Sequence, residues 1–462
     1  MHWDLARLSD ECDAQLRAIR AQRVAPAIAR GDVARELERR YPFDGPHGIG
    51  EVAADVIALL ERGNLHTAHP RYFGLFNPGV RFSSVVADLI SASINPQIGA
   101  WFHSPAGVEI EEHTLRFLLR AFGFDPRTSA AHFTSGGSEA NLTATLAAFG
   151  SVYPETRRQG VRGLDRQPVL LVSSEAHHAF FKIARHMGLG DEAVRTVPAD
   201  GRFRMRVDAL REAVERDKPF MVVATAGTTA GGAIDPLEEV AGVCAEHGIW
   251  LHVDAAWGGA AILSPRLKQH LKGIEHADSI TCDAHKWLGV AMGAGMFFTR
   301  RPEALAAFEI DASYVPRGDE LDLYRSSLQW SRRFIGLKLF LALAELGADG
   351  IAKQLDHQAA MADLLRDGLR NEGWEIVNDS PFPLVCFRRE GVDVAELVRR
   401  IVAGGDHWIS HAVLGGGIGV ARACITNHET AEEDVASLLR ALRGEKVNGQ
   451  SGGDADRNPA EE

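Results

Sequence analysis

Short apolar runs alternate with longer amphipathic segments between residues 169 and 253. Strands are predicted at 169–172, 220–225 and 249–253, where the runs have the length of buried strands, and helices at 176–187 and 236–247, where apolar residues recur at helical spacing. Gly248 follows the second helix, at the position where a glycine commonly ends one. This alternation predicts a mainly parallel sheet, whose ligands bind beyond the carboxyl ends of the strands.

The rest of the chain adds smaller parts to this sheet. Residues 296–299 predict a strand that returns across it, and 332–346 predict a helix that leads into a C-terminal part. That part alternates helix, strand, helix and strand at 351–371, 384–388, 394–402 and 421–425. The glycine-rich run 415–419 lacks the helix and the acidic residue of a dinucleotide site, so it predicts a hairpin. We expect four parts: a helical segment at 1–65, a large domain at 66–349, a small α/β domain at 350–442 and a disordered polar tail at 443–462.

Composition narrows the class of protein. With 462 residues and 45% hydrophobic content, the chain can bury a large core, and its net charge of -12 argues against a nucleic-acid-binding surface. The five cysteines form no Cys-x-x-Cys pair, there is no His-Glu-x-x-His, and the adjacent His177 and His178 point about 100° apart on a helix, so no metal site is expected. The absence of a signal-like start and of a membrane-length apolar run favours a cytoplasmic protein without membrane contact.

Two strand ends carry the most informative side chains. Asp254 ends one apolar run, and Lys286 follows another apolar run 32 residues later. Pyridoxal phosphate (PLP) needs a lysine amine for a Schiff base and a carboxylate beside its ring nitrogen. Either residue alone also has an ordinary explanation, as a turn cap or a surface lysine. Together they predict a PLP site, with His285 beside the lysine.

A glycine-rich turn supplies what the phosphate of PLP requires. Residues 133–141 place Gly137 and Ser138 where a helix begins. Backbone N–H groups at a helix start attract a dianion, glycine permits its close approach, and a serine hydroxyl adds a donor. We therefore predict that this turn binds the phosphate.

The motifs together resemble one known family, the group II PLP-dependent decarboxylases, which include aromatic-amino-acid, glutamate, histidine and diaminobutyrate decarboxylases. The resemblance covers about residues 69–436 and rests on the shared order of the segments 69–74, 104–109, 133–141, 174–178, 224–229, 250–256, 283–287, 329–334 and 421–427. It implies a PLP-dependent transferase of fold type I, with a mainly parallel seven-stranded sheet covered by helices on both faces. It also implies decarboxylation of an L-amino acid to an amine and CO2.

The resemblance implies roles for further residues. His177 would stack on the PLP ring, Ala256 would lie against the opposite face, Thr228 would bind near the phenolic edge, and Ser279 would join the phosphate donors. A tyrosine would deliver the proton to the product, and Tyr324 is the better match, with Tyr314 as the alternative.

The substrate pocket would form near Tyr72 and Phe73, with Trp101 and His103 contributed by the second subunit of a homodimer. These aromatic residues favour an apolar substrate, whereas Arg71 and His103 would suit an acidic one. Arg422 either binds an anion or braces the C-terminal part. Other PLP reactions remain alternatives at this point, namely carbon–carbon cleavage, oxidative deamination and transamination, as does a scaffold without catalysis.

Overall fold

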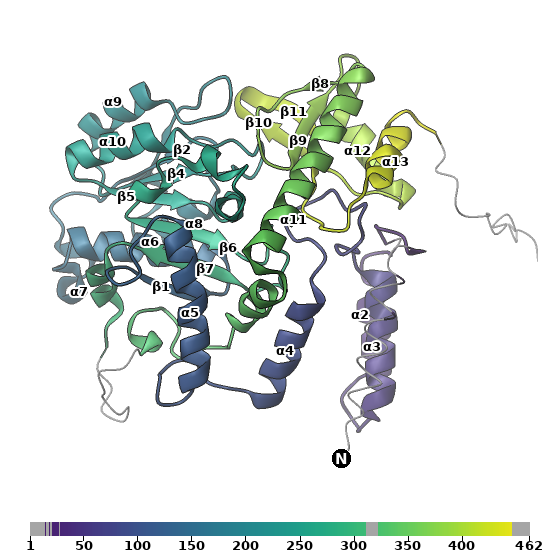
Figure 1. The fold of residues 1–462 in the computed structure, drawn as a ribbon, viewed down its shortest axis with the longest axis horizontal. Coiled ribbons are helices and arrows are strands. Elements are labelled where there is room, and N and C mark those ends of the chain that lie inside the picture. Colours follow the sequence, from purple (N-terminus) through teal and green to yellow (C-terminus); the bar gives the residue numbers. More distant parts are fainter. Residues whose placement is uncertain (1–13, 15–17, 19–20, 27, 311–321, 446–462) are drawn as a thin grey trace, which may run out of the picture.

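A seven-stranded sheet lies at the centre of the molecule in the computed structural model, which describes residues 14, 18, 21–26, 28–310 and 322–445 (Figure 1). The strand order is β1-β7-β6-β5-β4-β2-β3. The strands are β1 Ala130–Thr134, β2 Leu170–Ser173, β3 Val194–Val197, β4 Met221–Thr225, β5 Trp250–Asp254, β6 Ser279–Asp283 and β7 Gly295–Thr299. Neighbours among β2 to β6 are parallel, whereas β7 runs antiparallel to both β6 and β1. The predicted fold class and the returning strand at 296–299 are confirmed.

Helices cover both faces of this sheet because its strands are apolar on both sides. Along β4, Val222 and Ala224 belong to one hydrophobic core and Met221 and Val223 to the other, as expected when successive side chains point to opposite faces. The helices of the large sheet are α5 Pro105–Ala121, α6 Gly137–Val152, α8 Ala179–His186, α9 Val207–Asp217 and α10 Leu237–His247. Gly248 ends α10 in the left-handed conformation, with φ 64°, as predicted.

A second, four-stranded antiparallel sheet forms in the C-terminal part, in the order β10-β11-β9-β8. Its elements are β8 Glu375–Ile376, β9 Leu384–Arg388, α12 Val394–Gly404, β10 Ser410–Leu414, β11 Ile418–Cys424 and α13 Glu432–Leu442. The helix α11, Leu337–Asn371, runs from the large sheet to this one and is interrupted at Gly347, which has φ 64° (Figure 1). The predicted hairpin is present, because Gly415–Gly417 joins β10 to β11.

The N-terminal helices stand apart from the two sheets. Helices α2, Asp32–Arg40, and α3, Ile49–Gly63, lie beside each other at the edge of the molecule, and neither has a buried residue (Figure 1). Helix α4, Phe82–Ile94, packs on α11 but leaves Phe82, Ile90 and Ile94 exposed.

Short elements complete the chain: α7 Thr156–Gln159 and the 3-10 turns η2 Val161–Gly163, η3 Asp191–Ala193, η4 Gly258–Leu263, η5 Lys268–Leu271, η6 Ile274–His276, η7 Pro302–Phe308, η8 Leu323–Arg325 and η9 Gly415–Gly417. Within the described ranges, no helix has both the length and the apolar character that crossing a bilayer would require.

Candidate active site

A cavity of about 340 Å³ lies where the carboxyl ends of β4, β5 and β6 meet the start of α6. This is the edge of a parallel sheet at which ligands are expected to bind. Seven of the residues predicted for cofactor binding or catalysis line it: Gly137, Ser138, His177, Asp254, Ala256, His285 and Lys286. The structure therefore brings these seven predicted residues together in one cavity.

Asp254 and Lys286 reach the cavity from neighbouring strands. Strands β5 and β6 are parallel and adjacent, so Asp254 at the end of one lies on the same side as the loop after the other. The Asp254 carboxylate is buried and accepts hydrogen bonds from Asn141 Nδ2 at 2.9 Å and from the Ala256 N–H at 3.1 Å. The Lys286 Nζ lies 3.0 Å from Asp283 Oδ2. An acid and an amine thus face one space, as PLP requires.

The start of α6 forms a cradle of small residues. Gly136 precedes the helix, and no side chain among the described residues caps its first turn by a hydrogen bond. A Cβ atom on Gly137 would lie 2.8 Å from Asp283 Oδ2 and 3.1 Å from the Ala256 Cβ, so a side chain here would displace the Asp283 carboxylate. Ser138 is exposed in the same turn. The arrangement provides N–H groups and a hydroxyl for an anion.

Two histidines of the cavity have defined hydrogen bonds on one ring nitrogen. His177 Nδ1 accepts the Ala179 N–H at 3.1 Å, and His285 Nδ1 accepts the Ala294 N–H at 3.3 Å. In each neutral ring the proton is therefore on Nε2. The His177 ring is accessible at the cavity mouth, yet desolvation by the surrounding protein lowers its pKa below the ordinary histidine value. Burial also lowers the pKa of His285. Both rings are therefore neutral donors near pH 7.

Asp283 belongs to the site but received no role from the sequence. It ends β6 and is buried. Its Oδ2 lies 3.0 Å from Lys286 Nζ and 3.8 Å from His285 Nε2. Its Oδ1 is buried without a hydrogen-bond partner among the described residues. Its place at a strand end, three residues before the lysine, is the signal that could have identified it. Phe76 and Asn141 also line the cavity and were not assigned.

Ser279 and Thr228 do not lie where the resemblance placed them. Ser279 starts β6 and is four residues from its cavity end, and its Oγ is bonded to Trp250 Nε1 at 2.9 Å and to His252 Nδ1 at 2.8 Å. Thr228 Oγ1 accepts the Ala233 N–H at 3.0 Å inside its own turn. Neither side chain lines the cavity, so neither prediction of cofactor contact is supported in this structure.

The predicted substrate residues also lie outside the cavity of this chain. Tyr72 packs against Trp408, with ring centroids 5.3 Å apart, and Phe73 is fully buried in the core of the C-terminal part. Both predictions of pocket contact are wrong for the single chain, because both rings pack against residues of the C-terminal part. Arg71 is paired with Asp434 at 3.1 Å, which uses its charge.

Trp101 and His103 lie in the turn before α5, away from the cavity of their own chain. The Trp101 Nε1 donates to Glu109 Oε1 at 3.1 Å, and His103 is exposed. Their entry into the site of a second subunit stays a prediction.

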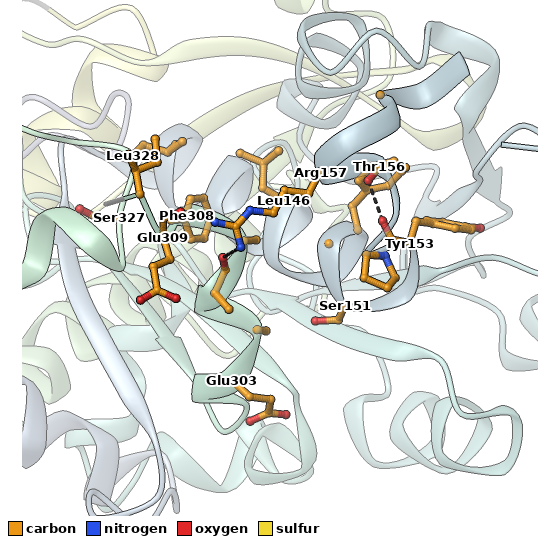
Figure 2. Close-up of a pocket in the computed structure, with 18 of the residues that line it drawn as sticks. Leu146, Ser151, Tyr153, Thr156, Arg157, Glu303, Phe308, Glu309, Ser327 and Leu328 are labelled. Carbon is orange, nitrogen blue, oxygen red and sulfur yellow. Dashed lines mark hydrogen bonds between the residues drawn. The ribbon is translucent and has the colours of Figure 1, made fainter. Parts of the chain in front are cut away.

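Tyr324 lines a different, larger cavity of about 660 Å³ between α6, α7, η7 and η8. Its ring packs against Trp330, with centroids 4.9 Å apart, and its N–H donates to the Gly99 carbonyl at 2.9 Å. Figure 2 shows this cavity with Arg157 at its centre, where the guanidinium donates to the Glu309 carbonyl at 2.5 Å. Tyr314 lies outside the described residues.

Arg422 braces the C-terminal part and retains one open donor. From β11 its Nε donates to the Thr229 carbonyl at 3.1 Å and its Nη1 to the Gly74 carbonyl at 2.9 Å. Its guanidinium carbon lies 4.8 Å from the ring centre of Phe76, a cavity residue. The Arg422 Nη2 is buried without a hydrogen-bond partner in the described part of the chain. The brace is therefore present, and an anion would satisfy the remaining donor.

A family model described as the pyridoxal-dependent decarboxylase conserved domain matches residues 32–390. The chain belongs to this decarboxylase family. It is 32% identical over 365 residues to the acidic amino acid decarboxylase GADL1 of Bos taurus, a match covering 76% of this chain and 69% of the relative. It is 31% identical over 409 residues to the cysteine sulfinic acid decarboxylase of Mus musculus, covering 82% of each chain. The crystal structure of Oryza sativa TDC with PLP and tryptamine is similar with a TM-score of 0.88 and 26% identity, over 95% of this chain and 96% of that chain.

The decarboxylase is a PLP-dependent carboxy-lyase that acts on an L-amino acid. Its cavity fits the cofactor in charge and shape. It offers the Lys286 amine, the Asp254 carboxylate and the start of α6. Glycine at position 137 keeps this helix start open, because an added side chain would narrow it. The open Asp283 Oδ1 is a further polar group that a bound molecule or water can satisfy.

Proposed function

We propose that Lys286 binds PLP covalently and that Asp254 faces the ring nitrogen of the cofactor. One observation carries this proposal: the two side chains come from neighbouring parallel strands and line one cavity together with the glycine turn of α6. When bound, PLP accepts the electron pair that loss of the carboxylate leaves on the substrate. Gly137, Ser138 and the N–H groups at the start of α6 hold its phosphate.

Asp254 keeps the facing nitrogen protonated. Its carboxylate accepts two N–H donors, from Asn141 and Ala256, which hold it in place beside the cavity. A negative charge beside the ring nitrogen then favours the proton on that nitrogen. The proton is what makes the ring an effective electron acceptor.

His177 orients the substrate. With its Nδ1 occupied by the Ala179 N–H, its Nε2–H is free to donate into the cavity, toward the carboxylate that will leave. The bond that breaks is the one held perpendicular to the cofactor ring, so a fixed donor to that carboxylate selects decarboxylation. Because the ring is neutral, loss of the carboxylate as CO2 does not have to break an ion pair with His177.

The substrate is an acidic amino acid in this proposal. The unpartnered Arg422 Nη2 next to Phe76 is a buried cationic donor that a second carboxylate, or a sulfinate, would satisfy. The similarity to an acidic amino acid decarboxylase and to a cysteine sulfinic acid decarboxylase supports the same substrate class.

A substrate panel tests this choice. Release of CO2 and formation of amine are measured with L-aspartate, L-glutamate, L-cysteine sulfinate, L-tryptophan and L-tyrosine. The acidic substrates should have the highest kcat/KM, and Arg422→Gln should raise their KM at least about tenfold. Arg366→Gln is the matched control, because Arg366 is also buried and donates to the Ser380 and Phe382 carbonyls. A preference for L-tryptophan, or equal effects of the two substitutions, would reject the acidic-substrate proposal.

The active unit is a homodimer in this proposal, and Tyr324 supplies the proton to the product carbon. Helices α2 and α3 bury no side chain in the single chain, and α4 exposes Phe82 and Ile94. Tyr324 does not line the cavity that contains Lys286 in its own chain. Its role therefore requires a site completed by a second subunit, as do the roles of Trp101 and His103. Light scattering at assay concentration should give twice the chain mass, and a fully active monomer would overturn the dimer.

A further inference from the structure

A buried row of polar side chains leads from the interior of the sheet to Asp254. On β5, Trp250, His252 and Asp254 alternate with apolar residues and therefore share one face of the strand. The register pairs His252 with Ser279 of β6, and α6 covers this face. Polar side chains buried in the sheet are stabilised by hydrogen bonds, since burying an unsatisfied polar group is costly.

The hydrogen bonds of this row form one continuous chain. Trp250 Nε1 lies 2.9 Å from Ser279 Oγ, and Ser279 Oγ lies 2.8 Å from His252 Nδ1. His252 Nε2 lies 3.0 Å from Asn141 Oδ1 and 3.4 Å from Thr281 Oγ1. Asn141 Nδ2 lies 2.9 Å from Asp254 Oδ2. All six side chains are at most 5% exposed. Water does not compete for these bonds.

The direction of every hydrogen bond in this network follows from the groups at its two ends, Trp250 and Asp254. The indole N–H of Trp250 can only donate, and the Asp254 carboxylate accepts. Asn141 must then turn its amide N–H toward Asp254 and its carbonyl toward His252, so His252 carries its proton on Nε2 and accepts from Ser279 on Nδ1. Burial lowers the pKa of His252 to about 4, which keeps the ring neutral and compatible with this single tautomer. Each donor points toward Asp254.

We propose that His252 is a positioning residue which, through Asn141, holds Asp254 in the orientation that faces the cofactor ring nitrogen. Asn141 lines the cavity, whereas His252 does not, so His252 acts through another side chain. Ser279 and Trp250 fix the tautomer of the ring. A fully satisfied buried network of this kind restricts its members to one arrangement. The inference rests on the proposed role of Asp254.

The network also gives the Ser279 hydroxyl and the Asn141 amide their roles. Ser279 does not reach the cavity because its hydroxyl is the donor that His252 Nδ1 requires. If that donor is lost, the ring can move its proton to Nδ1, and the unprotonated Nε2 then faces the Asn141 carbonyl, acceptor against acceptor. The amide would turn over and present its oxygen to Asp254, which removes the hydrogen bond that holds the carboxylate.

The test measures the protonation of the cofactor in addition to activity. Holoenzyme is prepared with PLP labelled with ¹⁵N in the ring, and the ¹⁵N chemical shift, the dissociation constant for PLP and kcat are compared between variants. His252→Leu should shift the ¹⁵N resonance toward its unprotonated position and weaken PLP binding by about ten- to a hundredfold, the effect expected from losing a hydrogen bond to a charged group. His252→Gln, which can still donate one N–H to Asn141, should restore most of both.

Matched variants separate positioning from loss of a buried histidine. His132 on β1 is also buried, and both its ring nitrogens lack a hydrogen-bond partner among the described residues. His132→Leu should lower the thermal midpoint at most and leave the ¹⁵N shift unchanged. If His252→Leu does not fold, Ser279→Ala and Asn141→Ala interrupt the same chain from either side, and at least one of them must shift the ¹⁵N resonance.

One outcome would overturn the role of His252, and a different outcome would overturn the role of Asp254 on which it rests. If Asp254→Asn shifts the ¹⁵N resonance while His252→Leu, Ser279→Ala and Asn141→Ala behave as His132→Leu does, the positioning role of His252 is wrong. If Asp254→Asn itself leaves the ring nitrogen protonated, the proposed role of Asp254 is wrong, and the network then has another purpose.

Discussion

Gln329 donates through its amide to both carboxylate oxygens of Glu139, at 2.8 Å and 2.9 Å. Glu139 lies in the first turn of α6, lines the cavity and also accepts the Ser135 N–H at 2.8 Å. Gln329 follows Tyr324 by five residues, so this contact attaches the segment that carries the proposed proton donor to the turn that holds the phosphate. A change in this contact should therefore affect the phosphate turn of the same chain, whereas Tyr324 itself is proposed to act in a site completed by the second subunit.

The first prediction concerns this contact. Gln329→Glu places two carboxylates against each other, and unit charges 4 Å apart repel by about 4 kcal/mol at an effective dielectric constant of 20. One carboxylate must then turn toward the phosphate turn, so the dissociation constant for PLP should rise at least about tenfold. Equilibrium dialysis with PLP measures this. Gln269→Glu, an exposed site far from the cavity, controls for the added charge, and equal affinities of the two variants would refute the connection.

The second prediction concerns Asp254. Asp254→Ala removes the negative charge that keeps the ring nitrogen protonated, so PLP should bind more weakly. Turnover should fall by at least about a thousandfold, which corresponds to about 4 kcal/mol of barrier. Single-turnover assays at saturating PLP distinguish lost chemistry from lost cofactor. Turnover near the wild-type rate would contradict the assignment.

The third prediction concerns Tyr324. Without its hydroxyl, Tyr324→Phe should still release CO2 but should deliver the proton slowly, because a positioned acid is worth about 10²–10⁴-fold. Oxygen can then react before the proton arrives, so much of the product should become aldehyde with ammonia and oxygen uptake. Tyr153→Phe is the control, since Tyr153 lines the same cavity (Figure 2). Amine at the wild-type rate without oxygen uptake would point to another donor, with Tyr314 or His177 tested next.

The fourth prediction concerns His407, which packs on Phe73 and bonds to Ser437 Oγ at 3.0 Å. Burial lowers its pKa to about 3, against about 6.5 in the unfolded chain. Below pH 6.5, His407 binds a proton in the unfolded chain but stays unprotonated in the folded chain. The free energy of unfolding therefore decreases as the pH falls. Between pH 7.5 and 5.5, wild type should lose about 1.4 kcal/mol more than His407→Gln in urea unfolding. Parallel losses in both proteins would show that His407 does not titrate in this way.

Much of the large sheet could be predicted because its strands are short apolar runs buried on both faces. The helix predicted at 332–346 begins later, at Leu337, and the reason is tertiary. Arg332 donates to the Phe133 carbonyl at 3.0 Å, and the Gly336 N–H donates to Glu111 Oε1 at 2.8 Å. These contacts hold residues 332–336 outside the helix, and no local pattern reports them.

The site could be predicted as far as it depends on strand ends. Asp254 and Lys286 follow apolar runs, so parallel order alone brings them to one edge. The direction of a hydroxyl depends on register and on neighbours, and for that reason Ser279 and Thr228 were misplaced. Tyr72 and Phe73 were misplaced because the C-terminal part, which they pack against, is distant in sequence. The pairing of His252 with Ser279 appears only once β5 and β6 are aligned.

Borohydride reduction followed by peptide mapping identifies the lysine that carries the cofactor, which we propose is Lys286. Holoenzyme is treated with borohydride, digested and analysed by mass spectrometry. We expect one pyridoxyl-modified lysine, Lys286, and no modification in Lys286→Ala. The control is Lys338→Ala, which removes another buried lysine that donates to the Met292 carbonyl and should be labelled as wild type. Modification of a different lysine in wild type, or unchanged labelling of Lys286→Ala, would show that Lys286 does not bind the cofactor.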